Sequence, residues 1–226
     1  DRVELTNLTG AMAVFSLIGP ESPSLLQKLG MNLPPDLPPG HHRPVDLAAG
    51  TVRVAAGSGL ALPGYTLLIP AADAAALWQQ LTAAGALPTG TALWQQLRVC
   101  QGRPAPGAEL TEAVNPLEAG LWQAISFDKG CYIGQETIAR LNTYQGVKQQ
   151  LWGLQLSQMV PSGESIWVGE EKVGQLTSVV DTPGGVRGLG YIRTKAGGAG
   201  LTVTVGEAQG QVVEVPYLSR GYLTPT

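Results

Sequence analysis

The chain has 226 residues, a formal net charge of -3 and only 14 Lys and Arg residues. This balance gives no electrostatic basis for extended contact with nucleic acid, so no direct nucleic-acid binding is expected. The sequence contains no run of about 18 apolar residues, so no membrane span is expected either.

The first part of the chain combines strand and helix patterns. Strands are predicted at 13–19, 50–56 and 64–69, and helices at 23–29, 71–84 and about 91–101. A proline-rich loop after the first helix contains His41 and His42, for which solvent exposure is favoured over a catalytic or metal-binding role. This order predicts an antiparallel sheet with helices on one face, which is the α+β class.

The pattern of the sequence changes at Gly146, where helix-like periodicity gives way to short strand-like runs. Short strands separated by glycine and proline turns are predicted at 151–156, 165–168, 172–180, 185–192, 201–205 and 212–215. Regular short strands of this kind predict a small all-β barrel or sandwich. The sequence therefore predicts an α+β body at 1–146 and a β domain at 147–226.

Reactive side chains are concentrated at 128–140, where the sequence reads Asp-Lys-Gly-Cys-Tyr-Ile-Gly-Gln-Glu-Thr-Ile-Ala-Arg. A short amphipathic helix over 135–141, beginning at Gly134, would place Cys131 just before a helix N-terminus and two residues after Lys129. Both neighbours favour a thiolate. Cys131 is therefore a candidate nucleophile, redox-sensitive thiol or transient metal ligand, although most free cysteines are small buried hydrophobes.

The cysteine and histidine content restricts the chemistry of this stretch. The only other cysteine is Cys100, which excludes a cluster held by four cysteines of this chain and favours a reducing compartment. Nucleophilic catalysis by Cys131 would need a base, normally a histidine, and the only two histidines lie in the proline-rich loop. A Cys–His hydrolase is therefore disfavoured, and no resident metal site is expected.

The sequence Lys-Gly-Cys-Tyr-x-Gly-Gln-Glu at 129–136 resembles the signature of the YgfZ family, the folate-binding relatives of the glycine-cleavage T-protein. The segments at 97–112 and 115–121 are also similar, and the second resembles the Pro-x-Glu-Ala segment shared with the T-proteins. The resemblance implies a ferredoxin-like or related α+β body followed by a C-terminal β-barrel. It also implies that the family has a further segment before the position of Asp1, so this chain is expected to be truncated.

The resemblance implies roles for individual residues. Glu118 matches the T-protein glutamate that binds the pterin ring, and a carboxylate suits this role because a pterin offers two parallel N–H donors. The folate would lie between the body and the barrel, with Cys131 and Lys129 as the reactive groups. The implied folate contacts are Glu118, Tyr132, Gln135, Glu136, Arg140 and Tyr222.

Simpler interpretations remain open for three of these side chains. Glu118 could be an exposed loop carboxylate. Arg140 could form a weak ion pair with Glu136, one helical turn earlier, instead of holding a pocket or a folate carboxylate. Tyr222 occupies the place of a folate-contacting tyrosine in the T-protein tail, but it could equally be a tail aromatic that covers the barrel.

The resemblance implies a tetrahydrofolate-binding protein that acts as a factor in the assembly or maintenance of iron–sulfur proteins, including tRNA-modifying enzymes. Its partners would be folate and iron–sulfur client or assembly proteins, in the cytoplasm or, in a eukaryote, in a plastid or mitochondrion. An aminomethyltransferase of the T-protein type is an alternative. It is disfavoured because Leu62 and Pro63 replace an acidic pair of the T-proteins, and because their catalytic aspartate would precede Asp1. A non-enzymatic scaffold with a vestigial pocket is the third possibility.

Overall fold

The computed structural model describes residues 2–34, 37–48 and 50–222. The chain divides into two compact units, residues 1–90 and residues 91–226, and each is described by itself. The sequence-based division at residue 146 falls inside the second unit, just before its first barrel strand, β5 (Gln149–Leu156). Residues 91–146 therefore group with the barrel.

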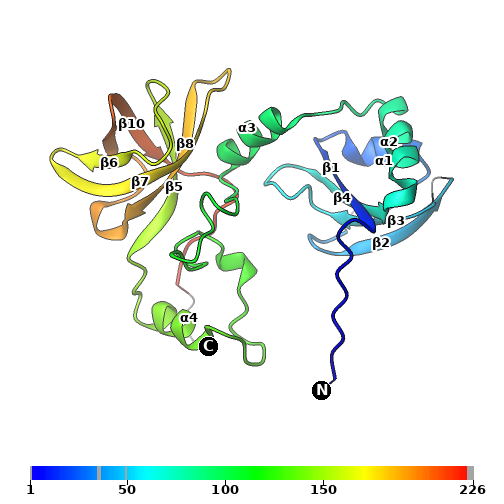
Figure 1. The fold of residues 1–226 in the computed structure, drawn as a ribbon, viewed down its shortest axis with the longest axis horizontal. Helices are drawn as coiled ribbons and strands as arrows, with labels where there is room; N and C mark the ends of the chain where they lie inside the picture. Colours follow the sequence, from blue (N-terminus) through cyan, green and yellow to red (C-terminus); the bar gives the residue numbers. More distant parts are fainter. Residues whose placement is uncertain (1, 35–36, 49, 223–226) are drawn as a thin grey trace. The chain divides into compact units, whose positions relative to one another are not determined.

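The first unit is a four-stranded antiparallel sheet with two α-helices (Figure 1). Its strand order is β1 (Met12–Ile18), β4 (Gly64–Pro70), β3 (Gly50–Ala56) and β2 (His42–Leu47). The helices are α1 (Ser22–Lys28) and α2 (Ala74–Ala83), the latter preceded by the 3₁₀ turn η1 (Ala71–Asp73). Alternate residues of β3 and β4 are buried together with helix residues, and this core includes Leu26, Val52, Val54, Leu67, Ile69 and Leu77.

Strand β2 corrects the prediction for the histidines. His42 begins this strand and pairs with Ala55 of β3, whereas the sequence placed it in a loop. None of the residues of this strand is buried; it contains Pro44 and lies at the sheet edge, where a missing N–H is tolerated. Its weak apolar alternation gave too little signal to predict a strand. Both His41 and His42 are exposed, as expected.

The second unit contains a closed six-stranded barrel (Figure 1). Its order is β10 (Ala208–Val213), β5, β8 (Val186–Arg193), β7 (Glu171–Val180), β6 (Ser165–Val168) and β9 (Thr202–Val205), with the 3₁₀ turn η3 (Thr194–Ala196) after β8. Its interior is filled by apolar side chains that include Leu154, Ile166, Leu176, Ile192, Val205 and Val212. The α+β class with a C-terminal barrel is thus confirmed.

Strand β10 begins and ends earlier than the predicted 212–215. The first four residues of the strand, Ala-Gln-Gly-Gln, include no large apolar side chain, and only Ala208 and Val212 of the strand are buried. The apolar residues after Val213 therefore belong to the tail that leaves the barrel.

Further elements of the second unit lie outside the barrel. They are helix α3 (Thr91–Gln101), the 3₁₀ turn η2 (Trp122–Ala124) and helix α4 (Gln135–Thr143). A small core joins the segment around η2 to α4, and its buried members are Leu117, Trp122, Ile138 and Val147. No helix among the described residues is long and apolar enough to cross a membrane.

The tail after β10 links several parts of this unit. The N–H of Tyr217 donates to the carbonyl of Gln101 at 2.8 Å, and the N–H of Ser219 donates to the carbonyl of Gly120 at 2.8 Å. The guanidinium of Arg220 stacks over the ring of Trp152 at 3.7 Å and donates to the carbonyl of Leu151 at 2.6 Å. The tail is therefore a structural part of the unit.

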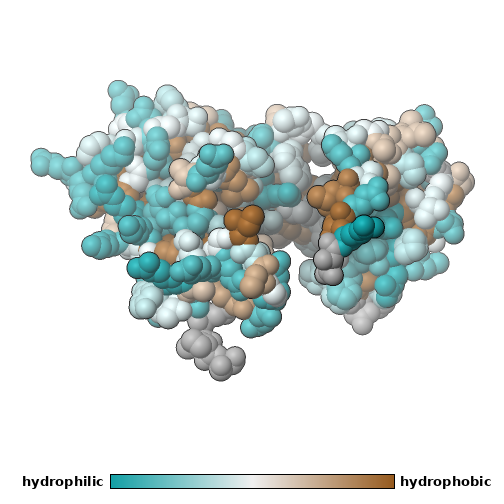
Figure 2. Space-filling model, turned by 60° about the horizontal axis from the view of Figure 1, so that its bottom comes forward, coloured by the Kyte–Doolittle hydropathy of each residue, from teal (hydrophilic) through white to brown (hydrophobic). Residues whose placement is uncertain are grey.

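The surface carries apolar side chains in small separate groups. The face seen in Figure 2 is mostly hydrophilic or neutral, with isolated patches of apolar residues. The most exposed large apolar side chains include Val3, Leu5, Leu87 and Ile133. Scattered exposure of this kind is normal for a globular protein.

Candidate functional site

Glu118 is held in a tight turn at 115–121. The side-chain oxygen Oδ1 of Asn115 accepts hydrogen bonds from the N–H groups of Leu117 and Glu118, each at 3.0 Å. Leu117 is fully buried below the turn, and the side chain of Glu118 is half-buried. Among the described residues, its carboxylate accepts one long hydrogen bond, from the N–H of Asn115 at 3.3 Å. The carboxylate therefore keeps most of its accepting capacity for a ligand.

The turn is also fixed to the barrel through its main chain. The carbonyl of Glu118 accepts a hydrogen bond from the N–H of Leu151, in strand β5, at 2.9 Å. The apolar side of the turn packs on Ile138 of α4 through the small core of the second unit. The carboxylate is thus presented by a rigid support, as a binding group requires.

Tyr222 lies against the same small core. Its ring meets the ring of Trp122 edge to face, with centroids 5.2 Å apart and an interplanar angle of 86°. Its hydroxyl accepts a hydrogen bond from the N–H of Val147 at 3.4 Å. The structure thus places Tyr222, the turn of Glu118 and helix α4 on one small core, and a folate contact by Tyr222 stays a prediction.

Helix α4 begins at Gln135, directly after Gly134, as predicted. Gly134 adopts a left-handed conformation with φ of 90°, which glycine adopts at little cost. Cys131 is exposed in the loop before the helix, and the ammonium of Lys129 lies 5.2 Å from the centre of the Tyr132 ring. The loop is therefore open to solvent, and the catalytic roles of Cys131 and Lys129 stay predictions.

The remaining motif residues lie along α4. Gln135 is half-buried, while Glu136 and Arg140 are exposed. The ion pairs found among the described residues do not include Glu136 with Arg140, so the pairing that the sequence left open is not formed. Arg140 is available to a ligand or partner, and its contact with folate stays a prediction.

Cys131 is expected to react with a thiol reagent at least about tenfold faster than Cys100 at neutral pH. Cys131 is exposed, whereas Cys100 is half-buried and burial raises the pKa of its thiol, opposed by the nearby Arg187. Since the thiolate is the reacting form, the rate at Cys100 should rise further as the pH increases above neutral. Stopped-flow labelling of Cys131→Ser and Cys100→Ser would assign the two rates, and equal rates would contradict the expectation.

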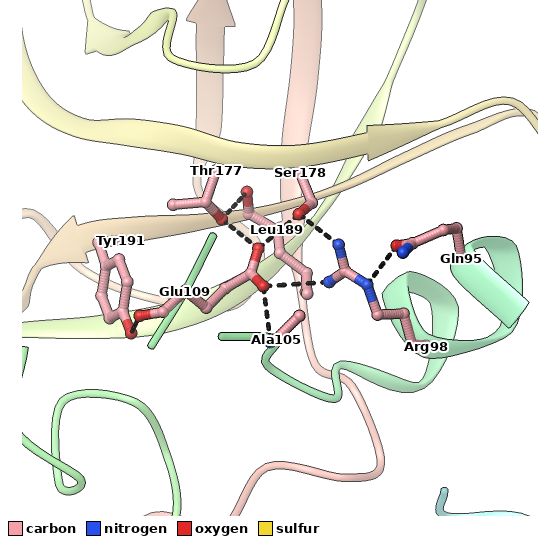
Figure 3. A network of polar contacts seen from close by, with 8 residues as sticks. All are labelled: Gln95, Arg98, Ala105, Glu109, Thr177, Ser178, Leu189 and Tyr191. Carbon is pink, nitrogen blue, oxygen red and sulfur yellow. Dashed lines mark hydrogen bonds and ion pairs between the residues drawn. The ribbon is translucent and has the colours of Figure 1, made fainter. Parts of the chain in front are cut away.

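A buried polar network that no sequence motif indicated surrounds Glu109 and is shown in Figure 3. Glu109 is completely buried and forms an ion pair with Arg98 of α3 at 3.0 Å. The hydroxyls of Thr177 and Ser178, in β7, donate to its Oε1 at 2.7 and 2.6 Å, and the N–H of Ala105 donates to Oε2 at 2.9 Å. The guanidinium of Arg98 donates two further hydrogen bonds, from Nε to the side chain of Gln95 and from Nη2 to the hydroxyl of Ser178.

One signal in the sequence could have indicated that Arg98 has a buried partner, although not which residue it is. Arg98 stands between Leu97 and Val99 on an otherwise amphipathic helix, and a charge among apolar positions needs a partner when it is buried. The partner, Glu109, lies outside any regular element and has no periodic pattern to place it. The pairing was therefore accessible only from the three-dimensional structure.

Tyr191 connects the network to the turn of Glu118. Its hydroxyl donates to the main-chain carbonyl of Glu109 at 2.8 Å. Burial raises the pKa of the Tyr191 phenol well above its usual value, and the carboxylates of Glu109 and Glu118 raise it further. The phenol is therefore a neutral hydrogen-bond donor at any physiological pH, and Glu118 lies close enough to act on it electrostatically.

Two pockets border the barrel in this unit. One, of about 390 Å³, lies between residues 108–114 and strands β5, β7 and β8, and its lining includes Thr111, Lys172, Tyr191 and Arg193. The other, of about 440 Å³, lies beside α3 and is lined in part by Cys100. Neither is lined by residues 128–140. Within the described ranges, no cluster of His, Cys, Asp and Glu has the composition of a metal site.

The chain is similar to a known domain family and to several curated proteins. Residues 1–129 match the GCVT N-terminal domain. The Arabidopsis thaliana protein named "Putative transferase At1g60990, chloroplastic" is 45% identical over 223 residues, which cover 97% of this chain and 52% of that protein. An aminomethyltransferase of Synechococcus elongatus is 31% identical over 179 residues, covering 78% of this chain and 48% of the relative. The chain thus spans about half the length of these relatives.

The fold is shared with a solved structure. The glycine cleavage system aminomethyltransferase T from Bartonella henselae superposes with a TM-score of 0.74 and 19% sequence identity, over 91% of this chain and 59% of that one. This likeness agrees with the sheet and the barrel described above. From the domain match, which covers more than half of the sequence, the chain belongs to the GCVT N-terminal domain family.

Proposed function

We propose that this protein binds tetrahydrofolate and that Glu118 recognises the pterin ring. The observation that carries the proposal is the half-buried carboxylate of Glu118, fixed in the turn at 115–121 and left with most of its accepting capacity. Such a carboxylate can accept two parallel N–H bonds, which is the arrangement that a pterin presents. Membership of the GCVT N-terminal domain family and the similarity to aminomethyltransferases support the same ligand class.

Other residues of the second unit have side chains suited to contact a folate. The aromatic pair Trp122 and Tyr222 lies on the core that supports the turn, and Arg140 on α4 offers a cation for a folate carboxylate. When bound, tetrahydrofolate would supply a carrier for one-carbon groups. The protein residues would bind and orient it.

We further propose an accessory role in the assembly or maintenance of iron–sulfur proteins, in preference to aminomethyl transfer. The turn at 58–65 supports this choice because it carries Leu62 and Pro63 where T-proteins have an acidic pair. This turn is organised by the buried Ser58, whose hydroxyl donates to the carbonyl of Leu62 at 2.8 Å. It therefore offers no carboxylate to a reacting amine.

The proposed setting of this role is the cytoplasm or an organelle, and the chloroplastic designation of the Arabidopsis relative supports a plastid in a plant context. Its partners would be iron–sulfur client or assembly proteins. A strain lacking the protein, complemented with the wild type or with Glu118→Gln, would test the role through the activity of iron–sulfur enzymes. Release of methylene-tetrahydrofolate from a glycine-cleavage mixture would favour the transferase instead.

Glu118→Gln is expected to raise the Kd for tetrahydrofolate roughly 10- to 100-fold, because one anionic acceptor is replaced by an amide that also carries donors. Isothermal titration calorimetry would measure this effect. Glu112→Gln is the matched control, since Glu112 is an exposed glutamate on the preceding segment. Equal affinities of wild type and Glu118→Gln for tetrahydrofolate would show that Glu118 does not contact the ligand. Absence of binding by the wild type would overturn the folate proposal.

A further inference from the structure

The segment from Glu109 to Glu118 is attached to the barrel at both of its ends. At one end the main-chain carbonyl of Glu109 accepts a hydrogen bond from the hydroxyl of Tyr191 at 2.8 Å. At the other end the main-chain carbonyl of Glu118 accepts a hydrogen bond from the N–H of Leu151 at 2.9 Å. Each attachment is a hydrogen bond to a main-chain carbonyl, so each fixes the path of the backbone.

The two anchoring residues are directly opposite each other in the barrel. Leu151 of β5 and Tyr191 of β8 are cross-strand partners in the antiparallel register. Both side chains are buried in one apolar cluster, against which the half-buried Val114, from the middle of the segment, also packs. One cross-strand pair of the barrel, Leu151 and Tyr191, thus holds both ends of the segment that presents Glu118.

Glu109 makes the first attachment rigid. Its carboxylate is completely buried and accepts four hydrogen bonds, from Arg98, Ala105, Thr177 and Ser178. Its backbone therefore has one fixed position, and the hydroxyl of Tyr191 binds to that position. A small displacement at Tyr191 would be transmitted through the short segment to the turn at 115–121.

We infer that Tyr191 is a positioning residue for Glu118, which sets the place of the ligand-binding carboxylate without touching the ligand. This inference rests on the proposed folate function for its ligand, but the attachment of the segment can be measured without any ligand. The raised pKa of the phenol is consistent with it, since the hydroxyl stays protonated and can always donate.

The test compares Tyr191→Phe with Ser178→Ala. Both remove one hydroxyl bound to Glu109, but only Tyr191 binds its main-chain carbonyl. Amide hydrogen exchange at Leu151, whose N–H donates to Glu118, reports the attachment of the turn. We expect exchange there to be about tenfold or more faster in Tyr191→Phe than in Ser178→Ala, under conditions where both variants are folded.

Tetrahydrofolate binding provides the second measurement. Tyr191→Phe should raise the Kd several-fold in the wild-type background and leave it unchanged in a Glu118→Gln background, because the effect acts through Glu118. Unchanged exchange at Leu151, or equal changes in both hydroxyl variants, would overturn the positioning role. Faster exchange in Tyr191→Phe together with no folate binding by the wild type would support the positioning role and overturn the folate proposal.

Discussion

Glu109→Ala is expected to lower the free energy of unfolding of the second unit by about 3–5 kcal/mol. The substitution leaves the guanidinium of Arg98, which is 7% exposed, buried without its counter-charge. It also removes the carboxylate that accepts from the hydroxyl of Ser178, whereas the hydroxyl of Thr177 keeps the carbonyl of Leu189 as an acceptor. Urea denaturation followed by tryptophan fluorescence would measure the loss, since Trp122 and Trp152 are buried in this unit.

Two further variants make this measurement specific. Glu112→Ala removes an exposed carboxylate three residues away and should change the stability by less than about 0.5 kcal/mol. The double variant Arg98→Met with Glu109→Leu removes both charges and should recover much of the loss, because an apolar pair has no desolvation penalty. A loss of under about 1 kcal/mol in Glu109→Ala would show that the network contributes little.

Gly174→Ala is expected to destabilise the barrel by about 3 kcal/mol or more, or to prevent its closure. A Cβ atom at Gly174 would lie 2.0 Å from the carbonyl oxygen of Tyr191 and 3.1 Å from the Cα of Ile192. Both are main-chain atoms of the neighbouring strand β8, so neither can rotate away. The strands β7 and β8 would have to separate where they are paired.

Gly184→Ala is the matched control for this prediction. It lies in the turn between the same two strands, and its nearest neighbour to an added Cβ would be the hydroxyl of Thr182, at an ordinary 3.8 Å. Both substitutions restrict the unfolded chain equally, so their difference measures the close approach alone. Thermal unfolding of the two variants would give this difference, and equal melting temperatures would refute the steric explanation.

Much of the fold could be predicted from local patterns. The bounds of α3 (Thr91–Gln101), β3 and β6 agree with the sequence because each pattern begins and ends with clear polar or glycine signals. Strand β2 was missed because none of its residues is buried, so its apolar alternation is weak. The predicted helix at 71–84 begins as the 3₁₀ turn η1 directly after Pro70.

Within the candidate site, the sequence predicted helix α4 and its start after Gly134. The structure places the turn of Glu118, helix α4 and Tyr222 on one small core, and their contacts with folate stay predictions. The network of Glu109 could not be predicted, because its partners are distant in the chain: Arg98 and Ser178 are separated by 80 positions. Tertiary pairing of this kind leaves no periodic trace in the sequence.

The tail contacts impose an order on assembly during protein synthesis. Gly120 and Leu151 receive hydrogen bonds from Ser219 and Arg220, which leave the ribosome much later. Proteins generally fold from the N-terminus as they emerge, so the first unit can be complete while these contacts are still missing. The turn that presents Glu118 would therefore gain these contacts only after residues 217–220 have emerged. A nascent chain stalled before Tyr217 would carry the whole motif at 128–140 and still lack the hydrogen bonds that Ser219 and Arg220 donate to Gly120 and Leu151.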